Sequence, residues 1–179
     1  SAHWNLIRQL TKREIATRYR GSVLGMLWAF LHPMVMLMVY TLVFRGAFGM
    51  RWGQESESAY DFGLLLFSGL IVHALFAESL HRAPYLIVNH SNYVKKIVFP
   101  LEILAWTSLG SALFHAAISA LVLIGCYGLL HHALHWTMLL VPLLLLPLAL
   151  VTIGISWFLA SAGVFVRDIG QASGPLTTI

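Results

Sequence analysis

The sequence predicts an all-α integral membrane protein, with an N-terminal amphipathic interface helix followed by four transmembrane helices. Hydrophobic residues make up 59% of the 179 residues and charged residues only 10%, whereas a soluble domain carries about 25% charged residues. Several apolar runs reach the length of about 20 residues that a membrane span needs. Basic residues gather at the ends of these runs, so the pI near 9.5 reflects membrane edges and no nucleic-acid partner is expected.

The first element is a helix over 1–22, expected to lie on the cytoplasmic membrane surface. Its less polar residues recur at three- and four-residue steps, at Trp4, Ile7, Thr11, Ile15 and Tyr19. This spacing marks one helix face, and the basic residues take other directions. We expect the apolar face in the acyl region and the basic face toward anionic headgroups. An ordinary juxtamembrane helix with snorkelling arginines is the open alternative.

The transmembrane domain is expected over 23–179. Its predicted spans are about 23–44, 62–80, 103–130 and 137–166. The last two come from one stretch, 103–166, that contains no Asp, Glu, Lys or Arg and is too long for a single crossing. The histidine-rich segment after Leu130 divides it. Pro33 favours a kink in the first span, and Pro142 and Pro147 favour a kink or broken start in the fourth.

The distribution of Lys and Arg predicts the orientation. Nine of the 11 lie before the first span, between the second and third, or after the fourth, and only Arg45 and Arg51 lie in the other loops. Short loops rich in Lys and Arg stay in the cytoplasm. The N terminus and the loop at about 81–102 are therefore expected inside.

Motifs for catalysis are missing from the sequence. There is no P-loop, nucleophile elbow or H-E-x-x-H motif, so we expect no catalytic residue and energy supplied by a partner. Glu78-x-x-His81 is half of a di-iron carboxylate pattern, although Glu78 and Arg82 more simply form an i,i+4 salt pair. A membrane-embedded metalloenzyme stays open as an alternative, using His73, Glu78 and His81 or the cluster of His131, His132 and His135. No metal site is the expectation.

Three segments together carry a family resemblance. The first is Arg18-Tyr19-Arg20-Gly21-Ser22-x-Leu24-Gly25-x-x-Trp28, followed by Pro33 and Tyr40-Thr41-Leu42-Val43-Phe44. The second is Asn92–Glu102 and the third is Phe165–Ile169. In order and spacing they resemble the membrane subunit of ABC-2 type polysaccharide exporters, the O-antigen and teichoic acid permeases.

The resemblance implies a homodimer whose subunits have six membrane helices each, so this chain with four looks partial. It implies export of a lipid-linked, O-antigen-like polysaccharide on polyprenyl pyrophosphate across the bacterial inner membrane. ATP and Mg would belong to a separate ATP-binding subunit, with no cofactor in this chain. The alternative within transport is an ABC-2 exporter of a small lipid or drug.

The resemblance also suggests roles for particular residues. Cationic side chains at the inner interface suit an anionic headgroup, which would be the role of Arg13, Arg18 and Arg20; anchoring to membrane lipid is the simpler alternative. The bend into the first span would form a gate at Gly21, Ser22 and Gly25, where G-x-x-x-G spacing permits close backbone approach. Channel aromatics would be Trp28, Phe30, Tyr40 and Phe44, with lipid-facing positions as the alternative. The coupling loop to the ATPase would include Arg82, Tyr93, Lys95 and Lys96.

Overall fold

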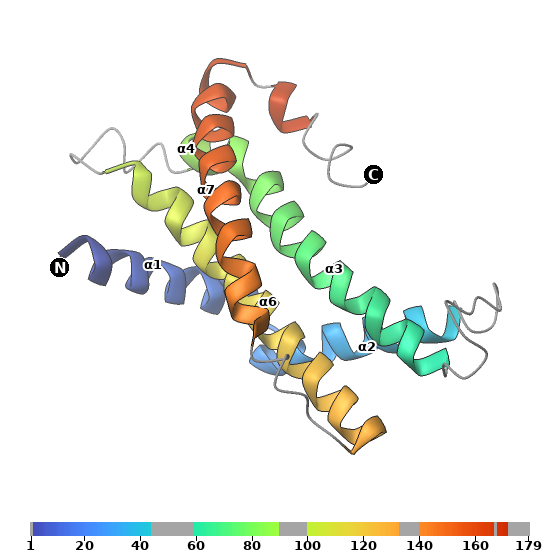
Figure 1. The fold of residues 1–179 in the computed structure, drawn as a ribbon. Helices are drawn as coiled ribbons and strands as arrows, with labels where there is room; N and C mark the ends of the chain where they lie inside the picture. Colours follow the sequence, from blue (N-terminus) through green and yellow to red (C-terminus); the bar gives the residue numbers. More distant parts are fainter. Residues whose placement is uncertain (1, 44–58, 90–99, 133–139, 167, 172–179) are drawn as a thin grey trace.

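The computed structural model describes residues 2–43, 59–89, 100–132, 140–166 and 168–171, and within these ranges it contains helices and turns but no strand. The elements in chain order are α1 (Ala2–Tyr19), the 3-10 turn η1 (Gly25–Leu27), α2 (Trp28–Val43), α3 (Ala59–Arg82), the 3-10 turn η3 (Ala83–Tyr85), α4 (Leu86–Asn89), α6 (Glu102–His131) and α7 (Val141–Phe165). Figure 1 shows α1 leading into α2 and the longer helices crossing near the centre.

Among the described residues, four helices are long and apolar enough to cross a membrane: Gly25–Val43, Asp61–Asn89, Glu102–His131 and Leu143–Phe165. The predicted all-helical class with four membrane helices is confirmed. The fourth helix begins later than the expected 137, at Val141, with Pro142 in its first turn. That position suits proline because the first-turn N–H groups have no partner inside the helix.

Helix α6 is the centre of the fold. It contacts α1, α2, α3, α4 and α7. Small residues on one stripe, Ala112, Ala116 and Ala120, are 1%, 5% and 8% exposed. Without a hydrophobic driving force between helices in lipid, close backbone approach through such residues holds membrane helices together.

Helix α3 packs on α6 through one face. Leu64, Phe67, Ile71 and Leu75 follow at three- and four-residue steps and all belong to the apolar core. The same face continues toward the end of the helix through the buried Ser79. Its last turns carry Glu78 and Arg82, so the core stripe leads directly into a charged region.

The turn after α3 is buried against α7. Ala83 is fully buried, and a Cβ placed on Gly163 would lie 2.9 Å from Pro84 Cα. Residues 83–89 form η3 and α4 and both contact α7. This first part of the expected loop at 81–102 is therefore helical and packed, because Gly163 lets α7 approach the Pro84 backbone.

The junction between α1 and α2 is a sharp bend. Gly21 and Gly25 have φ of +89° and +50°, in the left-handed region that favours glycine. The Gly25 N–H donates to Ser22 O at 3.1 Å. The first span then starts as η1 before becoming α-helical at Trp28, later than the expected start at 23.

Helix α1 differs from the expectation in what its less polar face contacts. It packs against α6, with Ile15 8% exposed and a Cβ on Gly110 only 3.0 Å from the Thr11 side chain. Because Gly110 has no side chain, α1 can lie directly on α6 instead of presenting this whole face to acyl chains. Trp4, nearer the N terminus, is 67% exposed.

Candidate functional site

A cluster of charged side chains joins α1, α3 and α6. Glu78 on α3 is at its centre, with a side chain 19% exposed. It pairs with Arg18 on α1, with Arg82 one turn along α3 at 3.0 Å, and with Nδ1 of His115 on α6 at 3.2 Å. An unpaired carboxylate in apolar surroundings would cost several kcal/mol, so these partners are what permit a charged residue on the core stripe.

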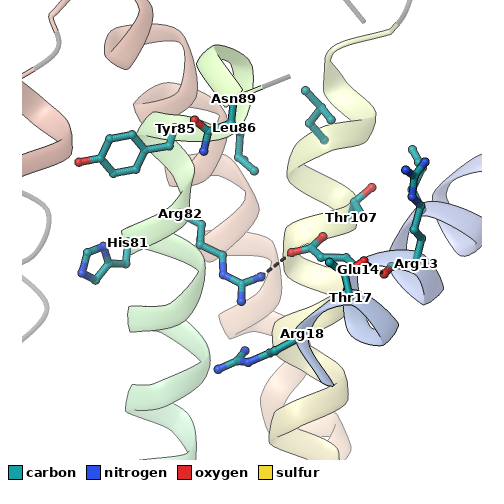
Figure 2. Close-up of a pocket in the computed structure, with 12 residues that line it drawn as sticks. Arg13, Glu14, Thr17, Arg18, His81, Arg82, Tyr85, Leu86, Asn89 and Thr107 are labelled. Atoms are coloured by element: carbon teal, nitrogen blue, oxygen red, sulfur yellow. Dashed lines mark hydrogen bonds and ion pairs between the residues drawn. The ribbon is translucent and has the colours of Figure 1, made fainter. Parts of the chain in front are cut away.

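A second ion pair crosses between α1 and α3. Arg82 pairs with Glu14 on α1 as well as with Glu78 on its own helix. Figure 2 shows Arg82 reaching from α3 toward Glu14, with Arg18 extending into the same space from the next turn of α1. Each helix thus contributes one arginine and one carboxylate, and the two pairs hold α1 against α3.

His115 completes the cluster from the middle helix. Its Nδ1 lies 3.1 Å from Arg18 Nη1 as well as near Glu78, while its Nε2 is buried and makes no hydrogen bond with the described residues. The Tyr19 ring stands edge-on to the His115 ring, with centroids 6.0 Å apart. Burial raises the pKa of the Tyr19 phenol above its ordinary range.

A cavity of about 790 Å³ opens beside these ion pairs. Its wall comes from α1, from the end of α3 with η3 and α4, and from the first turns of α6. Arg13, Glu14, Arg18 and Arg82 give it a charged side, while Leu10, Leu86 and Leu104 give it an apolar side. A cavity of this kind suits an amphiphile whose polar end is negatively charged, since three arginines face it against one lining carboxylate.

The sequence of this chain matches a known family over nearly its whole length. The model of the family described as ABC-2 type transporter matches residues 5–179. The chain belongs to this family. The earlier resemblance to ABC-2 membrane subunits is confirmed, and the four apolar helices together with the family make it a multi-pass membrane protein.

Similar curated proteins carry a more specific name. The ABC-2 chain is 29% identical over 177 residues to the O-antigen export system permease protein RfbA of Myxococcus xanthus. It is 24% and 22% identical to two proteins of that name from Klebsiella pneumoniae, each over 169 residues. These alignments cover 93–97% of this chain but only 62–64% of each relative. The chain therefore spans less than two thirds of the length of these relatives.

The three arginines predicted to meet a lipid headgroup fall in different places. Arg13 and Arg18 line the cavity, and Arg20 does not. Arg20 follows the end of α1 and is exposed, with its N–H donating to Thr17 O at 3.4 Å. The structure brings Arg82 to the cavity instead, although the sequence assigned it to the coupling loop. Arg82 belongs to the last turn of α3, where Glu14 and Glu78 hold it.

The predicted gate and channel residues lie along the bend and the first span. Ser22 is exposed, and Gly21 and Gly25 make the bend. Trp28 and Phe30 are 43% and 42% exposed on α2, and Tyr40 is half-buried. Their roles in a gate or a channel stay predictions. Phe44, Tyr93, Lys95 and Lys96 lie outside the described residues.

The histidines of the metalloenzyme alternative do not converge. His73 and His81 are exposed, and Figure 2 shows His81 directed away from Arg82 and α1. His131 pairs with Asp61 at 2.6 Å, and His132 is the C-cap residue of α6 with a φ of +50°, while His135 lies outside the described residues. Within the described ranges, no three His, Cys, Asp or Glu side chains gather in a metal-binding arrangement. The predicted salt pair between Glu78 and Arg82 does form.

Sequence reasoning missed His115 and Glu14. The available signal was that His115 is an ionisable residue in the middle of an otherwise uncharged span, and such residues mark functional positions. Glu14 is the only acidic residue in α1. Nothing in the local spacing pairs it with Arg82, which is 68 residues away along the chain.

Proposed function

We propose that the protein is the permease subunit of an ABC transporter that exports lipid-linked, O-antigen-like polysaccharide across the bacterial inner membrane. The observation that carries this proposal is the set of relatives named O-antigen export permease, aligned over 93–97% of the chain. Four described helices that could cross a membrane, and a helix that precedes the first of them, support it. The excess of Lys and Arg in the corresponding loops supports a cytoplasmic N terminus.

ATP hydrolysis belongs, in this proposal, to a separate subunit that binds ATP and Mg. The sequence supports this because it contains no phosphate-cradling loop. The permease acts as a homodimer, and the apolar faces of α2 and α7 offer surface for lipid, for a second copy or for further spans. Met38, Leu42, Leu144 and Phe158 on these faces are each at least 62% exposed.

The cavity beside the ion pairs is the proposed first contact for the pyrophosphate of the substrate. Arg13, Arg18 and Arg82 supply charge there, and bidentate guanidinium groups suit phosphate oxygens. Arg18 and Arg82 already pair with carboxylates. A headgroup that takes either arginine therefore competes with Glu14 or Glu78, and binding would loosen α1 from α3.

Deletion of the gene in its host, followed by gel analysis of surface polysaccharide, tests the transport proposal. We expect surface polysaccharide to disappear and lipid-linked glycan to accumulate inside, with both restored by the full-length gene. If a gene with Arg18→Gln also restores surface polysaccharide at normal protein abundance, the headgroup role is refuted and the transport proposal stands. Normal surface polysaccharide in the deletion strain would refute the glycan substrate and favour export of a small lipid or drug.

A further inference from the structure

A second hollow, on a different face of α1, lies between that helix and the first half of α6. We call it the α1–α6 groove, and its volume is about 310 Å³. Figure 1 shows α1 and α6 approaching each other near the end of α1 and separating toward its start. The apolar residues that line the groove are Trp4, Ile7, Ile15, Trp106, Leu109 and Leu113.

The groove has little capacity to hydrogen-bond a polar ligand. Apart from Arg8 and Lys12, the lining offers only the Thr11 hydroxyl and the indole N–H groups of Trp4 and Trp106. The Thr11 side chain lies against Gly110, where an added Cβ would be 3.0 Å away. A sugar or an extended peptide would leave its polar groups unsatisfied there, at about 1–3 kcal/mol each. The walls therefore select a hydrocarbon chain.

Two cations stand at the edge of this apolar surface. Arg8 and Lys12 are one helical turn apart on α1, both exposed, and both line the groove. Neither forms an ion pair with a carboxylate in the part of the chain that the structure describes. They differ in this from Arg18 and Arg82, whose charges Glu78 and Glu14 balance. Uncompensated positive charge beside hydrocarbon walls matches an anionic amphiphile.

The position of the groove fits a lipid in the cytoplasmic leaflet. Gly110 lies about 12 Å along α6 from its start at Glu102, at 1.5 Å per residue. With Glu102 taken at the cytoplasmic membrane edge, this distance puts the floor of the groove at acyl-chain depth, and the long side chains of Arg8 and Lys12 can extend from there toward the surface. Trp4 and Trp106, 67% and 37% exposed, are the aromatic type enriched at this membrane level.

We propose that the α1–α6 groove binds one anionic phospholipid of the bilayer, with an acyl chain against α6 and its phosphate between Arg8 and Lys12. The bilayer supplies this lipid in bulk, and the groove is separate from the cavity lined by Arg13 and Arg18. The bound lipid covers the part of α1 that α6 leaves exposed. The proposal requires only membrane insertion and does not depend on the transported substrate.

Native mass spectrometry of the full-length protein in detergent tests it, with phosphatidylglycerol and phosphatidylcholine of identical acyl chains as probes. We expect one phosphatidylglycerol per subunit to be retained in preference to phosphatidylcholine. The double variant Arg8→Gln/Lys12→Gln should bind phosphatidylglycerol about tenfold more weakly, because each basic residue near a membrane surface attracts anionic lipid. Arg20→Gln removes a charge just past the end of α1, outside both the groove and the cavity, and should change binding little.

Several results would overturn the proposal. Equal retention of the two lipids would show that the phosphate group is not recognised. An equal loss in Arg20→Gln would show general attraction to a basic segment. Displacement of phosphatidylglycerol by undecaprenyl phosphate at equal concentration would assign the groove to the carrier lipid.

A second variant, Ile7→Trp, fills the groove and leaves both cations in place, so it should also weaken lipid binding. Undiminished binding in a folded Ile7→Trp protein would contradict the proposed position of the acyl chain.

Discussion

Glu78 is the residue on which the charged cluster depends. Its carboxylate faces Arg18, Arg82 and His115, which come from three helices. Removing one member of a poorly hydrated ion pair leaves the other charge uncompensated, and that cost exceeds the value of the pair itself. Arg18 is 45% exposed, so water screens part of this cost.

Glu78→Gln should therefore destabilise the full-length protein by about 1–3 kcal/mol, with a matching fall in its thermal midpoint in detergent. Gln has nearly the same shape, so the loss reports charge and not packing. Glu14→Gln is the matched control on α1, because Glu14 pairs with one arginine that keeps Glu78 as a partner. We expect about 0.5–1 kcal/mol there. Equal effects of the two variants would contradict the central position of Glu78.

The residues of this cluster were predictable only where they are close in sequence. The spacing of Glu78 and Arg82 indicated their pair. Arg18 and His115 reach Glu78 across 60 and 37 residues, and no periodicity encodes which faces of two helices will meet. Arg18 was singled out as a cation expected near the membrane surface, and that position stays a prediction. Its carboxylate partner emerges only when α1 lies across α3.

At the level of elements, the contact between α7 and η3 depends on one glycine. Gly163 faces the Pro84 backbone so closely that an added Cβ would lie 2.9 Å from Pro84 Cα. Backbone cannot move aside as a flexible side chain can, and overpacking of this kind costs about 1–3 kcal/mol.

Gly163→Ala should lower the thermal midpoint of the full-length protein for that reason. Gly154→Ala is the control on the same helix, since a Cβ there meets nothing within 4 Å. Alanine is a better helix former than glycine by about 1 kcal/mol, so this control should be neutral or stabilising. A Gly163→Ala protein as stable as the Gly154→Ala protein would mean that α7 does not pack on η3.

The helices themselves were predictable because each apolar run has the length of a membrane crossing. The expected spans and α2, α3, α6 and α7 overlap throughout, and the ends differ by a few residues where Gly25 and Pro142 shape the first turn. The path of α1 was not predictable. The less polar face of α1 could contact either a lipid surface or a neighbouring helix. Because Gly110 has no side chain, this face packs on α6.

At the scale of the whole molecule, α6 is surrounded by the other described helices while α2 and α7 keep large apolar faces exposed. In water such faces would aggregate, but lipid solvates them as well as another helix does. The relatives are longer than this chain, which spans 62–64% of them. Further spans or a second copy would therefore find apolar surface on α2 and α7 without disturbing the core around α6.

The orientation that the charges predict can be measured directly. Ser56 lies between the first two spans and Ser91 between the second and third, so one crossing separates them. In a cysteine-free background of the full-length protein, Ser56→Cys should react with a membrane-impermeant maleimide in intact spheroplasts. Ser91→Cys should react only after lysis, because Lys95 and Lys96 beside it favour the cytoplasm.

The reverse labelling pattern would put Arg8, Lys12 and Arg18 outside. That placement would remove α1 from the leaflet where both the proposed headgroup contact and the proposed lipid groove must operate. Labelling of both positions in intact spheroplasts would instead mean that the segment Asp61–Asn89 does not cross, despite its length. Glu78 and Arg82 would then be in water, where ion pairs contribute little, and Glu78→Gln would no longer be costly. The topology measurement and the stability measurement therefore constrain each other.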